Sequence, residues 1–289
     1  RWEHSDRRKQ DLRRRKLDPK DFISGEACDH WRRYEEDFAW AKHFGHNAHR
    51  FSIEWAKCEP KEGKFDEAAL AHYASVLEAL RSRGIEPVVT LWHFTLPQWL
   101  MKRGGWEARD AVECFKKFVG RVVHDFALQV RYWITVNEPT VYAWKAYREG
   151  VWPPQAHDAL RSQKVLERLI HAHRAAYDII KFVDPASSVG VAHRLTEFEP
   201  SRPHSVADRL LAYAVEQFSN TRPLEATAAT SDFIGVNYYS RRRVRFSLTQ
   251  PHNFFIRTEP PVFATTDLGW EIYPEGLLQV LRRLAKYLK

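Results

Sequence analysis

Tyr132-Trp-Ile-Thr-Val-Asn-Glu-Pro139 is an apolar run that ends abruptly in an amide, a carboxylate and a proline. Its β-branched and aromatic residues predict a buried strand that delivers Asn137 and Glu138 to its carboxyl end. In a parallel α/β barrel, catalytic side chains gather at that end of the strands. The segment therefore predicts a parallel sheet with a site beside Glu138. Taken alone, Asn137-Glu138-Pro139 is also compatible with a simple helix cap.

Apolar runs of the same kind recur along the chain and alternate with helical patterns. Predicted strands cover 47–53, 87–93, 132–136, 188–193 and 232–239. Predicted helices cover about 30–44, 66–84, 107–126, 161–183, 204–219 and 274–288, and residues 1–27 are expected to be irregular. The strands are apolar throughout, as in a parallel sheet covered on both faces. We expect one α/β domain over residues 1–289, a barrel rather than a doubly wound sheet, because no glycine-rich phosphate loop follows any strand.

Composition narrows the class of protein. The chain has 289 residues, 44% apolar and 28% charged, which is typical of a globular protein. No apolar run approaches the ~18 residues of a membrane span, and no apolar segment at the N-terminus suggests a signal peptide. Three cysteines without metal spacing indicate reduced thiols in a cytoplasmic protein. No metal, organic cofactor or membrane contact is indicated.

The net charge of +8 comes largely from three basic runs, Arg7-Arg-Lys9, Arg13-Arg-Arg-Lys16 and Arg241-Arg-Arg243 with Arg245. Such runs raise the possibility of a nucleic-acid patch. Acidic residues interrupt the N-terminal runs, and no nucleic-acid motif accompanies them. We interpret these runs as solvated loops and expect no nucleic-acid partner.

Polar residues stand at the predicted end of every strand. They are Arg50 and Glu54 for the first, His93 for the second, Asn137 and Glu138 for the third, His193 for the fourth, and Asn237 with Tyr239 for the last. One such residue means little, but several strand ends together predict a shared site at the carboxyl face.

Five segments carry a family resemblance. They are Asn47-Ala-His-Arg-Phe-Ser-Ile-Glu-Trp55, Thr90-Leu-Trp-His-Phe-Thr-Leu-Pro97, Thr135-Val-Asn-Glu-Pro139, Asp232-Phe-Ile-Gly-Val-Asn-Tyr-Tyr239 and Gly269-Trp-Glu-Ile-Tyr-Pro-Glu-Gly276. In this order, they resemble segments of the family 1 glycoside hydrolases, the β-glucosidase family. The resemblance runs from about Ala27 to the C-terminus. It implies an incomplete (β/α)8 barrel holding strands two to six, or a barrel of which this sequence contains only part. The first strand would precede Arg1, and the last strands would follow Lys289.

The resemblance implies a β-glycoside substrate, either glucoside or galactoside, and a role for each strand-end residue. Glu138 resembles the general acid/base, and Asn137 the ligand of the sugar 2-hydroxyl. His93 resembles a sugar ligand, with Trp92 and Phe94 as possible walls of the cleft. The residues expected to orient the site are Arg50, Asn237 and Tyr239. Packing alone is an equally good interpretation of Trp92 and Phe94, and strand capping of Asn237.

The family's nucleophile stands in a Thr-Glu-Asn motif, which this chain lacks. A retaining mechanism needs a second carboxylate about 5–5.5 Å from the first. The only obvious surrogates are Glu54, Glu197 and Glu199. We therefore expect weak hydrolysis, with a non-catalytic carbohydrate-binding or degenerate barrel as the alternative. An open sheet would also expose edges at the family's second and sixth strands and favour self-association.

Overall fold

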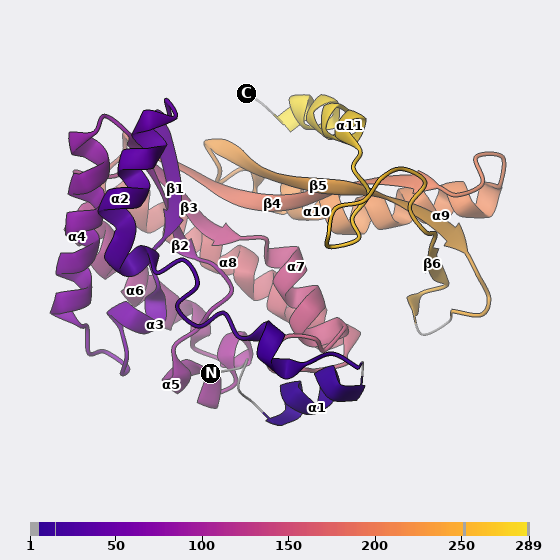
Figure 1. Ribbon diagram of the computed structural model, residues 1–289, viewed down its shortest axis with the longest axis horizontal. Coiled ribbons are helices and arrows are strands. Elements are labelled where there is room, and N and C mark those ends of the chain that lie inside the picture. Colours follow the sequence, from indigo (N-terminus) through magenta and orange to yellow (C-terminus); the bar gives the residue numbers. More distant parts are fainter. Residues whose placement is uncertain (1–5, 15, 251–252, 288–289) are drawn as a thin grey trace.

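A single six-stranded sheet runs through the molecule (Figure 1). The computed structural model describes residues 6–14, 16–250 and 253–287. The strands follow one another across the sheet in chain order: β1 (Ala48–Ser52), β2 (Glu86–Trp92), β3 (Tyr132–Asn137), β4 (Ser188–Pro200), β5 (Phe233–Phe246) and β6 (Ile256–Thr258). The first five are parallel, and β6 pairs antiparallel with the end of β5. The predicted parallel sheet is confirmed.

Helices follow the strands as the sequence predicts. The α-helices are α1 (Asp6–Arg14), α2 (His30–His43), α3 (Trp55–Cys58), α4 (Glu67–Ser82), α5 (Gln98–Lys102), α6 (Ala111–Phe126), α7 (Pro139–Ala143), α8 (Ala159–Val183), α9 (Val206–Glu216), α10 (Arg222–Ala228) and α11 (Pro274–Leu284). Short 3-10 turns are η2 (Pro19–Phe22), η3 (Gly105–Glu107) and η7 (Ala285–Tyr287), and π-helical turns are η4 (Trp144–Arg148) and η5 (Gln217–Thr221). Asp66 caps α4 by accepting a bond from the Ala69 amide, at the predicted start of this helix. Every helix within the described residues is too short or too polar to cross a bilayer.

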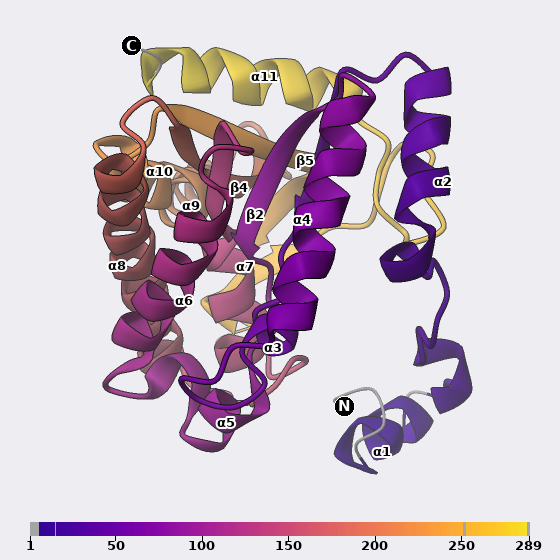
Figure 2. The same cartoon turned by 90° about the vertical axis from the view of Figure 1, so that its left-hand side faces the viewer.

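The helices form an outer layer around the curved sheet (Figure 2). α4 packs on β2, α8 on β3 and α6, and α9 on β4 and β5. Four tryptophans, Trp55, Trp92, Trp106 and Trp133, are almost completely buried between these layers. These four tryptophans therefore serve the core, as large aromatic side chains usually do. The architecture is an incomplete (β/α)8 barrel.

Three parts of the chain differ from the sequence prediction. Residues 1–27 were expected to be irregular, but Asp6–Arg14 form α1, while residues 1–5 and 15 lie outside the described residues. That stretch is rich in good helix formers, and its Leu12 is fully buried. β4 and β5 reach 13 and 14 residues, well beyond the predicted strand ends. Oppositely charged cross-strand neighbours such as Glu199 and Arg241, 2.8 Å apart, extend the pairing.

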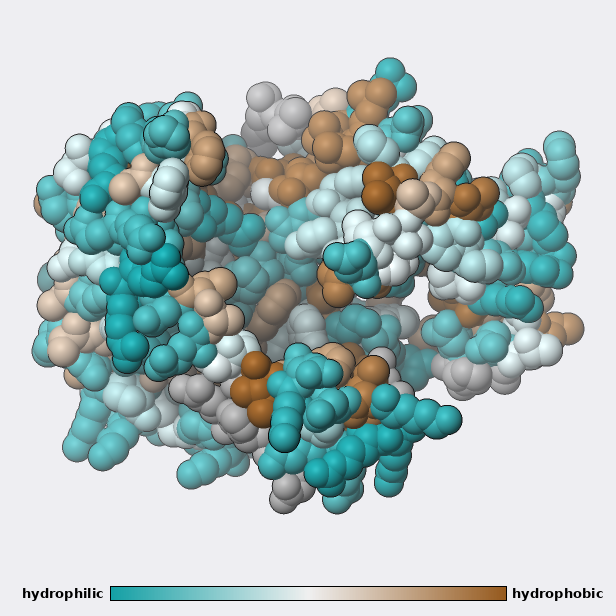
Figure 3. All heavy atoms as spheres, viewed as in Figure 1, coloured by the Kyte–Doolittle hydropathy of each residue, from teal (hydrophilic) through white to brown (hydrophobic). Residues whose placement is uncertain are grey.

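The long β4–β5 pair projects from the rest of the sheet (Figure 1). The face of the molecule seen in that view is hollowed between this projection and the N-terminal half (Figure 3). Apolar residues gather near α11 on the same face, where Leu277, Leu278 and Leu281 are exposed.

Candidate functional site

Glu138 stands where β3 ends and α7 begins. Its backbone is left-handed, with φ 46° and ψ 59°, and its amide donates to the Ala192 carbonyl on β4 at 2.7 Å. A non-glycine residue in this conformation costs roughly 1–3 kcal/mol. Glu138 is the cap residue of α7 by position, yet its side chain makes no capping hydrogen bond, and Pro139 offers no N–H in the first turn. The carboxylate is thus available for another role.

The Glu138 carboxylate is 6% exposed and is held by two side chains of β5. Its Oε1 accepts a bond from Asn237 Nδ2 at 2.7 Å and one from Tyr239 Oη at 3.5 Å. Because Asn237 and Tyr239 are two residues apart on a strand, both side chains point to the same face. Asn237 Nδ2 also lies 3.3 Å from Asn137 Oδ1, which joins β3 to β5.

Arg50 reaches the same place from β1. It donates to Asn137 Oδ1 at 2.6 Å, to Thr90 Oγ1 at 3.0 Å and to Asn237 Oδ1 at 3.4 Å. Among the described residues it makes no ion pair with a carboxylate. Burial lowers the pKa of Arg50, and the nearby Glu138 charge opposes that change. The guanidinium is therefore solvated by neutral oxygens rather than neutralised by an anion.

His93 and Phe94 lie at the rim of this cluster, and Trp92 lies beneath it. His93 is exposed on one side, and its Nδ1 is 3.0 Å from Ser52 Oγ. Partial burial, with the Arg50 charge second, lowers the pKa of His93. Phe94 packs on Trp152 with ring centroids 4.8 Å apart. Trp92 is only 1% exposed and donates its indole N–H to the Thr95 carbonyl, so it offers a ligand almost no surface.

The three carboxylates considered as surrogate nucleophiles are engaged elsewhere. Glu54 caps α3 through the Ala56 amide and accepts from Thr95 Oγ1 at 2.7 Å. Glu197 pairs with Arg283, and Glu199 with Arg241. Arg50, which bonds to neutral oxygens, does not pair with Glu54 either.

A further cluster of acidic and thiol side chains lies apart from Glu138. Glu62, Asp110 and Cys114 bring their ligand atoms within 4.8 Å of one another. Arg103, however, bonds to both Glu62 and Asp110. Because the positive charge of Arg103 already neutralises these two carboxylates, the three residues do not fit a metal ion.

The Arg241–Arg245 run is not the solvated loop that its charge suggested. It lies in β5, and Arg241 is bonded to Glu199 and Glu271. Arg242 lines a cavity that also involves Arg194, two residues that sequence reasoning did not select. The signal available was the alternation of strand residues past Tyr239, which places every second arginine on one face.

Comparisons with known proteins agree with this geometry. The family model described as glycosyl hydrolase family 1 matches residues 10–227. Beta-glucosidase A of Thermotoga maritima is 28% identical over 89% of this chain and 64% of its own length. An aryl-phospho-beta-D-glucosidase of Bacillus subtilis is 32% identical over 89% of this chain and 65% of its own.

Solved structures give the same result. A beta-glycosidase from Pyrococcus horikoshii superposes with a TM-score of 0.83 at 32% identity, covering 90% of this chain and 64% of that one. The chain thus spans a little under two thirds of the length of the relatives it matches. Because the family model covers most of the chain, the protein belongs to glycosyl hydrolase family 1.

Proposed function

We propose that this chain carries the acid/base side of a β-glycoside hydrolase site, with Glu138 as the general acid and base. The setting of the Glu138 carboxylate carries the proposal: it is nearly buried at the carboxyl end of β3 and fixed by Asn237. A carboxyl group so placed is suited to protonate a glycosidic oxygen and then to activate water. The names of the relatives support β-linked glucosides as substrates, with galactosides as the second choice.

The neighbouring side chains receive supporting roles. Asn137, whose Oδ1 is occupied by Arg50 and Asn237, would turn its amide N–H groups toward the sugar 2-hydroxyl. His93 and Phe94 at the rim would contact the sugar. Arg50, Asn237 and Tyr239 would orient Glu138 and any anion beside it. Residues 1–289 would act as one unit, because the contributing strands share one sheet.

Weak turnover is part of the proposal. Among the described residues, the candidates for a second carboxylate are engaged in capping or ion pairs, so a double displacement has no evident nucleophile. General acid catalysis alone contributes roughly 10²–10⁴ in rate. The same observation favours the second candidate function, a non-catalytic carbohydrate-binding barrel.

Hydrolysis of aryl β-glucosides distinguishes a hydrolase from a non-catalytic carbohydrate-binding barrel. We expect Glu138→Gln to lower the rate about 10²–10⁴-fold with phenyl β-glucoside. The loss should be much smaller with 2,4-dinitrophenyl β-glucoside, whose leaving group needs no proton. Glu113→Gln, an exposed carboxylate on α6, is the matched control. Equal losses with both substrates would refute the acid role, and binding without turnover in the unmodified protein would establish the carbohydrate-binding alternative.

Two further features are proposed on structural grounds. Within the described residues β1 has no strand on its outer side, and β6 covers only the last part of β5, so self-association through the sheet edges is expected. Sedimentation at several concentrations would show whether it occurs. The three unpaired cysteines support a cytoplasmic location.

A further inference from the structure

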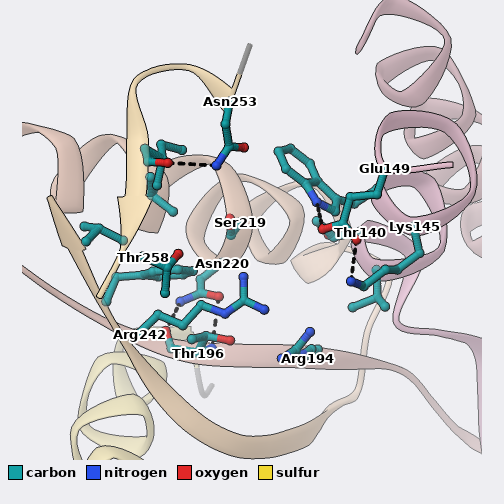
Figure 4. A pocket seen from close by; sticks show the side chains of 16 residues that line it. Thr140, Lys145, Glu149, Arg194, Thr196, Ser219, Asn220, Arg242, Asn253 and Thr258 are labelled. Carbon is teal, nitrogen blue, oxygen red and sulfur yellow. Dashed lines mark hydrogen bonds and ion pairs between the residues drawn. The ribbon is translucent and has the colours of Figure 1, made fainter. Parts of the chain in front are cut away.

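A cavity of about 220 Å³ adjoins the Glu138 site on its β4–β5 side. Its walls come from α7, η4, β4, α9, η5, β5 and β6 (Figure 4). A water molecule takes about 30 Å³ of liquid, so the cavity has room for a small charged group with some hydration. Trp144, Phe198 and several aliphatic side chains supply apolar surface, and hydroxyls, amides and charged groups supply the polar surface.

Two guanidinium groups dominate the charge of this cavity. Arg242 of β5 reaches into its middle, and Arg194 of β4 lies along its floor (Figure 4). Neither forms an ion pair with any carboxylate in the part of the chain that the structure describes. The third cation, Lys145, is neutralised by Glu149 at 2.5 Å, and Trp144 Nε1 donates to the same carboxylate at 2.6 Å. The cavity therefore holds two unmatched positive charges.

The two guanidinium groups differ in exposure, since Arg194 is half-buried and Arg242 is exposed. Partial removal from water and then the charge of Arg194 lower the pKa of Arg242, while the charge of Glu149, already paired with Lys145, opposes this change. Arg194 Nε is buried and has no hydrogen-bond partner within the described residues. A buried donor without an acceptor costs about 1–3 kcal/mol. An oxyanion between the two arginines would relieve both penalties, and the planar fork of arginine suits carboxylate, phosphate and sulfate alike.

The backbone is irregular where it forms the walls. The β4–β5 register shifts between Leu195 and Glu197, beside Arg194. Both π-helical turns, η4 and η5, contribute lining residues. Bulges and π-helical turns re-aim side chains and are frequent at functional sites. Their convergence on one cavity supports a binding role rather than a packing defect.

A short path of contacts connects the cavity to Glu138. The Arg194 guanidinium lies 5.8 Å from the centre of the Tyr239 ring, and Tyr239 Oη donates to Glu138. Thr140, in the cavity wall, follows Glu138 by two residues on α7. Arg50 lies on β1 and His93 directly after β2, on the other side of Glu138. A general acid stands between the sugar and its leaving group, so the cavity is on the leaving-group side.

We propose that this cavity binds an anionic group, a carboxylate, phosphate or sulfate, carried by the leaving group of the β-glycoside. The inference rests on the proposed function, because it takes Glu138 as the acid that separates the two halves of the substrate. The sugar occupies the side of Arg50 and His93, and the anion sits between Arg194 and Arg242.

Binding of substrate analogues that resist hydrolysis tests this without turnover. Calorimetry would compare phenyl 1-thio-β-D-glucoside with its 3- and 4-carboxyphenyl counterparts. We expect a carboxylated compound to bind about tenfold more tightly, equivalent to about 1.4 kcal/mol. The preference should shrink as salt is raised, because the arginines are reached through solvent. Inorganic phosphate and 4-hydroxybenzoate, which carry no sugar, would show whether the cavity binds a free anion.

Variants assign the effect to the cavity. Arg242→Gln and Arg194→Gln should abolish the preference, Arg242→Lys should keep part of it, and Arg209→Gln, exposed on α9, should not change it. Arg242→Lys keeps the positive charge, so a preference retained in this variant and lost in Arg242→Gln would show that the loss reflects anion binding and not misfolding.

The outcomes are distinct. Equal binding of the phenyl and carboxyphenyl compounds would overturn the anion site and leave the proposed function standing. Binding of phosphate or 4-hydroxybenzoate as tightly as the carboxyphenyl glucoside would overturn the leaving-group assignment. If neither thioglucoside binds, the proposed function fails, and this inference fails with it.

Discussion

Acid is expected to destabilise this protein through His173, which lies on α8 behind β3. The side chain is 1% exposed, with Nδ1 2.7 Å from Thr135 Oγ1 and Nε2 2.9 Å from Thr230 Oγ1. A neutral imidazole donates to one hydroxyl and accepts from the other, whereas the imidazolium has two donors and no acceptor. Burial lowers the pKa of His173 to about 4.

The magnitude follows from proton linkage. In the unfolded chain His173 titrates near 6.5. Between pH 6.5 and about 4 the unfolded state binds a proton that the native state does not, so the free energy of unfolding falls as the pH falls. The slope is about 1.4 kcal/mol per pH unit, and the loss over the interval is about 3 kcal/mol. Above pH 6.5 the contribution is fully present.

Urea unfolding followed by circular dichroism, at pH values between 4.5 and 7.5, measures the slope. Glutamine at position 173 keeps an amide donor and acceptor but does not titrate. We expect His173→Gln to lose less stability on acidification than the unmodified protein, by about 1.4 kcal/mol per pH unit. His171→Gln, exposed on the same helix, should leave the slope unchanged. Parallel curves for His173→Gln and the unmodified protein would refute the reasoning.

Three more predictions concern packing, helix propensity and the accessibility of thiols. A Cβ at Gly190 would lie 2.4 Å from a backbone carbonyl oxygen of β5, so Gly190→Ala should destabilise by about 1–3 kcal/mol. Gly120→Ala, in α6 with nothing within 4 Å of the new Cβ, should instead stabilise by about 0.5–1 kcal/mol, and destabilisation there would contradict the expectation. In the native protein a thiol reagent should label the exposed Cys28 quickly. The buried Cys58, whose pKa burial raises to about 12, and the buried Cys114 should react only on unfolding, and rapid labelling of two thiols would be the contrary result.

Local sequence patterns were sufficient to predict the structure of segments that depend mainly on their own residues. The apolar run before Asn137 could only be a buried strand, and Asp66 marks a helix start through its own side chain. The meeting of Arg50, Asn137 and Asn237 followed from parallel strands sharing one carboxyl edge. Each of these inferences needed only the period of a strand or one capping residue.

The remaining features depend on partners distant in the sequence. The β4–β5 extension exists because residues near 200 and 243 pair across strands, which no local pattern reveals. The left-handed backbone of Glu138 is set by its bond to Ala192 on the next strand. The arginine cavity draws on segments more than a hundred residues apart, so charge alone indicated only solvated residues.

Electrostatics separate this face of the sheet from an ordinary core. Arg50 and Arg194 are partly buried and Arg242 is exposed, and none of the three forms an ion pair with a carboxylate among the described residues; Arg50 is bonded to neutral oxygens instead. Buried charges without counter-ions cost free energy that apolar packing would not. A fold constrained only by stability would have little reason to place three unpaired cations around one carboxylate. The cost is understandable if ligands supply the missing negative charge. The leaving group of the substrate is the first place to look for that charge.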